Sequence, residues 1–264
     1  MDDLLAQLER YYDEAPRANA DSEEHGPFTI FVSRAGWPYY ARPRLGYTDD
    51  ITPDEVTSVL ARLEELGLPS SIEWVHDTTP SLRGAAMAAG VEVGDHPLLV
   101  LAGDPVEWAG PVVVRRITPD DPELPAVQAA ITLGFGQDDT LVGPVSVAER
   151  DALVAGGSPH VETLSALLAA GRSVMFGAFD PELGAVGGGS HNPRSDVTEI
   201  VGVGVLPALR RRGIAGHLTW VLAQDAAQSG IRTTFMSAGS DDVARIYEGV
   251  GFRRAGTACI ATGG

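Results

Sequence analysis

The run of residues from 197 to 206 constrains the fold most, because its side chains are almost all apolar and many are β-branched. Such a run, with little polar alternation, is typical of a strand buried on both faces of a sheet. A turn at Pro207 follows, and small residues then open a predicted helix from about Gly213 to Ser229. A buried strand, a turn and a helix in this order predict an α/β fold.

Similar patterns divide the rest of the chain into two parts. After residue 110 we expect strands at 112–116, 173–179, 184–190, 233–237 and 255–261, and helices at 122–135, 147–154, 161–170 and 241–249. Before residue 102 we expect a helix and a polar linker over 1–25, strands at 28–32, 37–43 and 71–75, a strand pair or one bent strand at 91–101, and helices at 53–66 and 80–89. Glycine, proline and a change in charge density at 102–111 place a domain boundary near residue 110. The expected domains are therefore residues 1–110 and 111–264.

The helix predicted at 53–66 has the clearest start signal in the first part. Thr52 is the expected N-cap, Pro53 fits the first helical position, and Glu55 completes a capping box. Gly67 ends the helical spacing of apolar residues.

Charge restricts the partners of the chain. Its 264 residues carry a net charge of −17, and all 19 basic side chains are arginine, which excludes a Schiff-base lysine. Residues 1–110 hold 20 acidic and 7 basic side chains, whereas residues 111–264 hold 16 and 12. An acidic surface of this kind disfavours nucleic acid as a partner. It either attracts a cationic amine or serves only to keep the protein soluble.

Other classes are disfavoured by what the sequence lacks. The longest apolar runs fall far short of the roughly 20 residues that span a bilayer, and the first residues have no basic and apolar segments typical of a secretory signal. A single cysteine, Cys259, gives neither an internal disulfide nor a zinc site. We therefore expect a cytoplasmic protein that uses no metal and binds no membrane.

The turn after the buried strand is rich in glycine and arginine. Residues 203–218 read Val-Gly-Val-Leu-Pro-Ala-Leu-Arg-Arg-Arg-Gly-Ile-Ala-Gly-His-Leu. Backbone N–H groups at a helix start have no partner inside the helix and converge on an anion. The small residues Gly213, Ala215 and Gly216 let an anion approach the backbone, and the arginines add positive charge. A nucleotide pyrophosphate fits this pattern.

This turn resembles the pyrophosphate loop of the GNAT superfamily of acyl-CoA-dependent N-acyltransferases, whose pattern is Q/R-x-x-G-x-G/A. Here the pattern is Arg210-x-x-Gly213-x-Ala215, preceded by a strand end with the spacing of the family and followed by a segment, 244–252, similar to its Y-E-x-x-G-F helix and turn. The resemblance covers residues 112–262.

The resemblance implies a GNAT fold for the second domain, which is an α/β fold with a mixed sheet, and acetyl-CoA as co-substrate. It also implies which residues bind that co-substrate: Val203, Gly204 and Val205 at the splayed strand end, for the pantetheine arm; Arg210, Arg211, Arg212, Gly213, Ile214, Ala215 and Gly216, for the pyrophosphate. Ser240 stands where the family often has an asparagine that contacts the cofactor, and it can cap the helix that follows.

Two residues are the expected catalytic groups. Tyr247 matches the tyrosine that lies near the CoA sulfur in the family and protonates the leaving thiolate, although it could only pack there. Glu199 occupies a position where many members carry a glutamate that takes a proton from the incoming amine; it could instead hold a cationic substrate or face solvent. His191, expected in a loop, is the rival base, while His217 and Cys259 are expected to be structural.

The first 110 residues resemble the second half of a GNAT domain without its pyrophosphate loop, with Ala86 or Met87 in place of the tyrosine. We expect a degenerate GNAT-like domain of a tandem protein, or else an unrelated α/β cap.

The function implied is transfer of an acetyl or longer acyl group from acyl-CoA to the primary amine of a small molecule, by direct attack in a ternary complex. Two alternatives remain open at this point: a thioester carried by an acyl carrier protein as donor, and a non-catalytic CoA-binding module. The acceptor is not specified by any residue pattern, and a homodimer is not excluded.

Overall fold

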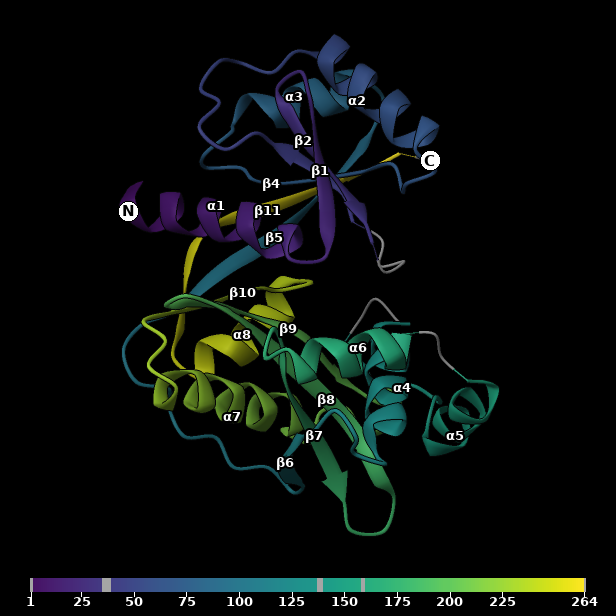
Figure 1. The fold of residues 1–264 in the computed structure, drawn as a ribbon. Helices are drawn as coiled ribbons and strands as arrows, with labels where there is room; N and C mark the ends of the chain where they lie inside the picture. The colour runs from purple at the N-terminus through teal and green to yellow at the C-terminus, as the bar shows by residue number, and fades with distance from the viewer. Residues whose placement is uncertain (1, 35–38, 137–139, 158–159, 264) are drawn as a thin grey trace. The chain divides into compact units, whose positions relative to one another are not determined.

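The computed structural model describes residues 2–34, 39–136, 140–157 and 160–263. It divides into two compact units (Figure 1). Unit 1 comprises Met1–Leu98 and Arg254–Gly264, and unit 2 comprises Leu99–Arg253. The expected domains, 1–110 and 111–264, differ from these units, because the first boundary lies after Leu98 and because residues 254–264, with most of the last strand, belong to unit 1.

Each unit mixes helices with strands, as the sequence predicts. Unit 1 contains α1 (Asp2–Arg17), β1 (Ala20–His25), β2 (Phe28–Ser33), β3 (Ala41–Pro43), α2 (Pro53–Glu65), β4 (Ser71–Val75) and α3 (Ser81–Ala88). Unit 2 contains β6 (Val113–Ile117), α4 (Leu124–Phe135), α5 (Val147–Gly156), α6 (His160–Ala169), β7 (Val174–Asp180), β8 (Gly184–Arg194), β9 (Val197–Val205), the 3-10 turn η1 (Pro207–Leu209), α7 (Ile214–Gln228), β10 (Thr233–Ser237) and α8 (Asp241–Gly249). Two further strands, β5 (Glu92–Leu101) and β11 (Phe252–Thr262), each have residues in both units.

The sheet of unit 1 has the strand order β1-β2-β3-β4-β11. Only β3 and β4 run parallel; the other pairs are antiparallel. The prediction of a polar linker at 20–25 was wrong, because these residues form β1 as the partner of β2. Their polar side chains suit an edge strand, whose pairing comes from its neighbour rather than from its own apolar pattern.

The capping box that the sequence predicts at the start of α2 is present. Oγ1 of Thr52 accepts a hydrogen bond from the backbone N–H of Glu55 at 3.3 Å, and Oε2 of Glu55 accepts one from the backbone N–H of Thr52 at 2.8 Å. Two of the four free N–H groups that every helix start presents are therefore satisfied by the side chains of α2 itself.

The C-terminal strand completes the sheet of unit 1. β11 pairs with β4 from Ala258 opposite Val75 to Thr262 opposite Ser71. Cys259 on β11 is buried in the core of unit 1, in agreement with its expected structural role.

The sheet of unit 2 has the strand order β10-β9-β8-β7-β6, with β9 and β10 parallel and the other pairs antiparallel. Helices α4 and α7 cover opposite faces of this sheet. A Cβ built on Gly188 of β8 would lie 2.6 Å from Val127 of α4, and one built on Gly189 would lie 3.0 Å from Leu222 of α7. Because successive residues of a strand point to opposite faces, the two helices must lie on opposite sides.

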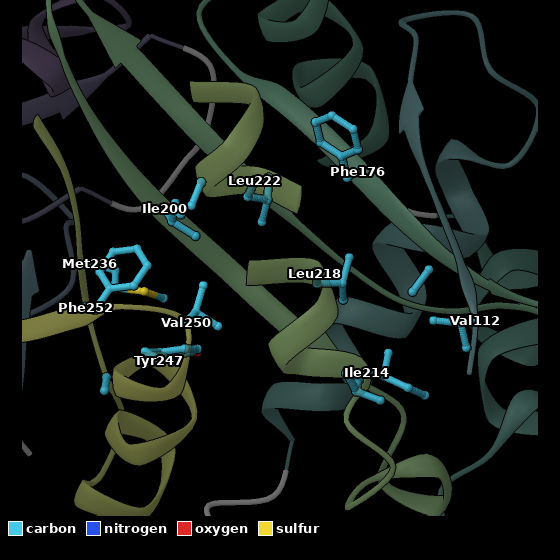
Figure 2. Close-up of a cluster of buried hydrophobic side chains, with 14 of the residues drawn as sticks. Val112, Phe176, Ile200, Ile214, Leu218, Leu222, Met236, Tyr247, Val250 and Phe252 are labelled. Atoms are coloured by element: carbon cyan, nitrogen blue, oxygen red, sulfur yellow. The ribbon is translucent and has the colours of Figure 1, made fainter. Parts of the chain in front are cut away.

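Helix α8 packs on the same side of the sheet as α7. Figure 2 shows Leu218 and Leu222 of α7 in one buried cluster with Tyr247 of α8 and with Phe252. This cluster fixes the start of α7 and the end of α8 relative to each other. In the part of the chain that the structure describes, no helix is both long enough and apolar enough to cross a bilayer.

Candidate active site

The pairing of β9 with β10 covers only the first three of the nine residues of β9. The parallel register joins Val197 to Thr233, Thr198 to Thr234 and Glu199 to Phe235, and it stops there although β9 continues to Val205. Two parallel strands that separate leave backbone N–H and C=O groups facing a gap, where a ligand can take the place of the missing strand partner. Val203, Gly204 and Val205 lie beyond the last residue pair of the two strands, and their contact with a pantetheine arm stays a prediction.

Helix α4 approaches the free end of β9 closely. A Cβ built on Gly204 would lie 2.9 Å from Cα of Ile131, and one built on Gly134 would lie 2.8 Å from the backbone N of Val205. No side chain fits at either position, because real Cβ atoms essentially never come within 3.0 Å of another residue's heavy atoms. The two glycines thus let the backbone of α4 lie directly on the strand end.

The turn between β9 and α7 has a backbone suited to anions. Arg211 has φ +65° and Gly213 has φ +78°, both in the left-handed region. Left-handed residues in such a turn orient successive N–H groups toward one side and form an anion-binding concavity. The N-cap of α7 is Gly213, and no side chain caps this helix. Its first N–H groups and the positive end of its dipole therefore remain available to a ligand.

The three arginines of the turn differ in what they contact. Arg210 donates from Nη2 to the backbone oxygen of Gly134 at 2.7 Å and from Nη1 to that of Leu141 at 3.3 Å. Its guanidinium thus links the turn to the end of α4. Arg211 and Arg212 are exposed, and among the described residues neither pairs with an acidic side chain. These two are the arginines that can meet a phosphate.

Ser240 and Tyr247 lie at the two ends of α8. Oγ of Ser240 accepts a hydrogen bond from the backbone N–H of Val243 at 3.3 Å, which confirms that Ser240 caps the helix. Tyr247 is only 5% exposed, and its burial raises the pKa of the phenol above its ordinary value. The phenol therefore stays protonated at neutral pH and can donate a hydrogen bond.

Glu199 lies where β9 and β10 part. It is the last residue of β9 that is paired with β10, and its side chain is half-buried. Alternation along β9 places it on the face opposite to Thr198 and Ile200, which contribute to the α7 side of the sheet. The carboxylate is thus on the side of the sheet that α4 covers further along the strand.

His191 is not in a loop, as expected, but in β8, where it is 1% exposed. Its Nδ1 lies 3.1 Å from Oγ1 of Thr198 and its Nε2 lies 3.0 Å from Oδ2 of Asp225. Burial lowers the pKa of His191, against the opposing effect of Asp225. Both ring nitrogens are engaged, so His191 is a poor rival to Glu199 as a base and instead joins the sheet to α7.

Trp108, which the sequence analysis did not single out, lies against the start of α7. A Cβ built on Gly216 would lie 2.5 Å from Cε2 of Trp108, and one built on Gly249 would lie 2.5 Å from its Cζ3. Two glycines inside helices are the sequence signal that could have indicated a large neighbour. His217, expected to be structural, stacks on Trp220 with ring centroids 5.9 Å apart.

Comparisons with known proteins agree with this geometry. Residues 132–252 match the family model described as acetyltransferase (GNAT) family. A GCN5-related N-acetyltransferase from Kribbella flavida is 18% identical, with a TM-score of 0.68 over 98% of this chain and 96% of that chain. A GCN5-related N-acetyltransferase-like protein from Streptococcus suis is 12% identical, with a TM-score of 0.56 over 98% and 99% of the two chains.

A tandem GNAT protein from the clavulanic acid biosynthesis pathway is also similar in fold. It is 13% identical, with a TM-score of 0.54 over 89% of this chain and 78% of that chain. The comparison with curated proteins gives no significant match. The chain has the mixed α/β fold of these structures along nearly its whole length, and its residues 132–252 form a domain of the acetyltransferase (GNAT) family.

Proposed function

We propose that the protein is an N-acetyltransferase that moves the acetyl group of acetyl-CoA to the primary amine of a small molecule. One observation carries the proposal: beyond Glu199, β9 continues without β10 as a partner and runs into the turn that opens the uncapped helix α7. The first feature suits the amide groups of a pantetheine arm, which can bond to free strand backbone. The second suits the pyrophosphate that ends this arm in CoA.

The proposed reaction is a direct transfer. The amine nitrogen forms a bond to the thioester carbonyl carbon, and the carbon–sulfur bond breaks. Glu199 accepts a proton from the incoming ammonium, directly or through a water molecule, so that the nitrogen lone pair becomes available. The amide nitrogen loses a second proton after attack; one proton ends on the thiol sulfur and the other in solvent.

Tyr247 acts on the leaving group in this proposal. Because its pKa is raised by burial, the phenol is a weaker acid than a CoA thiol. It therefore stabilises the thiolate mainly by donating a hydrogen bond, and complete proton transfer comes later from another donor. Such a bond strengthens as negative charge develops on sulfur, so it lowers the barrier more than it favours binding of the thioester.

Calorimetric titration with acetyl-CoA tests the proposal, with two matched glycine variants. Gly213→Glu places a carboxylate at the anion site, whereas Gly90→Glu puts the same side chain on another left-handed glycine with open space around it. We expect one acetyl-CoA per chain, strong weakening in Gly213→Glu, and wild-type affinity in Gly90→Glu. Equal affinities in all three proteins would reject the site.

A panel of primary amines, followed by detection of free CoA thiol, then tests the reaction itself. Thiol release that depends on both an amine and Glu199 supports acetyl transfer. Tight CoA binding without turnover of any amine would instead favour the non-catalytic CoA-binding module. Turnover of an acyl carrier protein in preference to acetyl-CoA would favour the carrier as donor.

A further inference from the structure

Trp108 is held in place by the backbone of its own segment. This segment, residues 102–112, connects β5 to β6 and lies beside the residues that end α8. The backbone N–H of Ala102 donates to the oxygen of Gly251 at 3.2 Å, and that of Val106 donates to the oxygen of Val250 at 2.8 Å. The position of the indole is therefore fixed from both sides, by these bonds and by the helices on which it rests.

The orientation of the indole is set by the three glycines nearest to it. Its six-membered ring lies beside Gly249, since Cζ3 is the nearest atom there, and its five-membered ring lies beside Gly216. At Gly213, the atom nearest to a built Cβ is Nε1, at 3.3 Å. Nε1 is also 2.7 Å from a Cβ built on Gly216, so the polar edge of the ring lies beside the first turn of α7, next to the N-cap at Gly213.

This N–H group lacks a protein partner. Within the described ranges no acceptor is bonded to Nε1, and the indole is only partly buried. A buried tryptophan N–H usually finds a hydrogen-bond acceptor, and a ligand that covered this partly buried ring would have to supply one. Packing between two helices would need only an aromatic ring, so it does not account for a polar edge placed beside the anion site.

We infer that Trp108 belongs to the nucleotide end of the acetyl-CoA site, where its indole N–H donates a hydrogen bond to a pyrophosphate oxygen. The inference rests on the proposed function. It adds a side-chain donor from outside the β9–α7 turn to the backbone donors of that turn. Hydrogen bonds to a charged acceptor are about twice as strong as neutral ones, so this contact distinguishes a phosphorylated donor from a bare pantetheine thioester.

Trp108→Phe tests the inference, because phenylalanine keeps an aromatic ring between the two glycines and removes the N–H group. We expect the affinity of the full chain for CoA to fall on the order of tenfold, as loss of a hydrogen bond to a charged group implies. The affinity for acetyl-pantetheine, which has no phosphate, should be unchanged. A fall for both ligands would show that Trp108 acts through packing and would overturn the inference.

A spectroscopic measurement separates these outcomes further. The indole N–H resonance of Trp108, identified by its absence in Trp108→Phe, should shift when CoA is added to the nitrogen-15-labelled protein and stay in place with acetyl-pantetheine. Wild-type binding of CoA without this shift would reject the role of Trp108 and leave the proposed function intact. No binding of CoA by the wild type would instead reject the proposed function, and the inference with it.

Discussion

Replacing Gly249 by alanine should have effects of opposite sign in the presence and absence of Trp108. A Cβ on Gly249 would lie 2.5 Å from Cζ3 of Trp108, about 1 Å short of ordinary van der Waals contact. Since the segment carrying Trp108 is bonded to the end of α8, the ring cannot retreat freely. Overpacking of this kind costs about 1–3 kcal/mol, whereas alanine in place of a helical glycine gains about 0.5–1 kcal/mol.

The net expectation for Gly249→Ala is a loss of about 1 kcal/mol in the free energy of unfolding. In a Trp108→Ala background the collision is absent, so the same substitution should stabilise by about 0.5–1 kcal/mol or be neutral at the helix end. Gly84→Ala is the matched control, because Gly84 lies in α3 with nothing within 4 Å of a built Cβ. This substitution should raise the free energy of unfolding in both backgrounds.

Thermal unfolding followed by circular dichroism measures these effects, at about 2–4 °C per kcal/mol for a chain of this size. The two backgrounds form a double-mutant cycle, whose coupling energy reports the contact between residues 108 and 249 alone. Equal shifts of Gly249→Ala in both backgrounds would refute the packing of Trp108 on α8. The indole would then not be held beside Gly213, and the argument for its hydrogen bond would fail.

Two further outcomes follow from buried ionisable groups. Tyr247→Phe should lower kcat by about a hundredfold with little change in KM for acetyl-CoA, because the phenol acts on the thiolate; steady-state kinetics with unchanged kcat would contradict this role. In unit 1, burial raises the pKa of Glu73 to about 7, so the free energy of unfolding should fall as pH rises from about 4.5, its ordinary value, through 7. Glu73→Gln should remove this loss, so that the wild type and the variant melt at the same temperature at pH 4 and the variant is the more stable at pH 8. A difference in melting temperature between the two proteins that does not change with pH would exclude Glu73 as the origin of the pH dependence.

Local sequence patterns predicted those parts of the fold whose cause is local. Thr52 and Glu55 cap α2 through bonds between residues three apart, and this geometry depends on little else in the chain. The buried strand β9 and the glycine start of α7 were predicted for the same reason. The pattern around Gly213 also predicted an uncapped helix start, because free N–H groups at a helix start need only that the helix begin there.

Long-range pairing explains what the sequence did not reveal. His191 appeared to lie in a loop because it follows a glycine-rich segment, and only Asp225, 34 positions away, completes its buried environment. Arg210 appeared to be one of three equal cations, and its bond to the backbone of Gly134 spans 76 positions. Trp108 stands in a segment that resembles a linker, and its role depends on glycines more than a hundred positions later.

Two of the helix starts that follow parallel strands show why the proposed site is assigned to unit 2. In unit 1, α2 follows β3, but Thr52 and Glu55 bond to each other's backbone N–H groups and leave fewer of them for a ligand. In unit 2, α7 follows β9 without any side-chain cap, and glycine at its N-cap leaves its first N–H groups accessible. A capped helix start favours stability of the isolated chain, whereas an uncapped one costs stability that a bound anion can restore. The site proposed in unit 2 combines the free N–H groups of α7, the part of β9 that β10 does not pair and the indole beside the first turn of α7, and a phosphorylated thioester offers an acceptor to each of them.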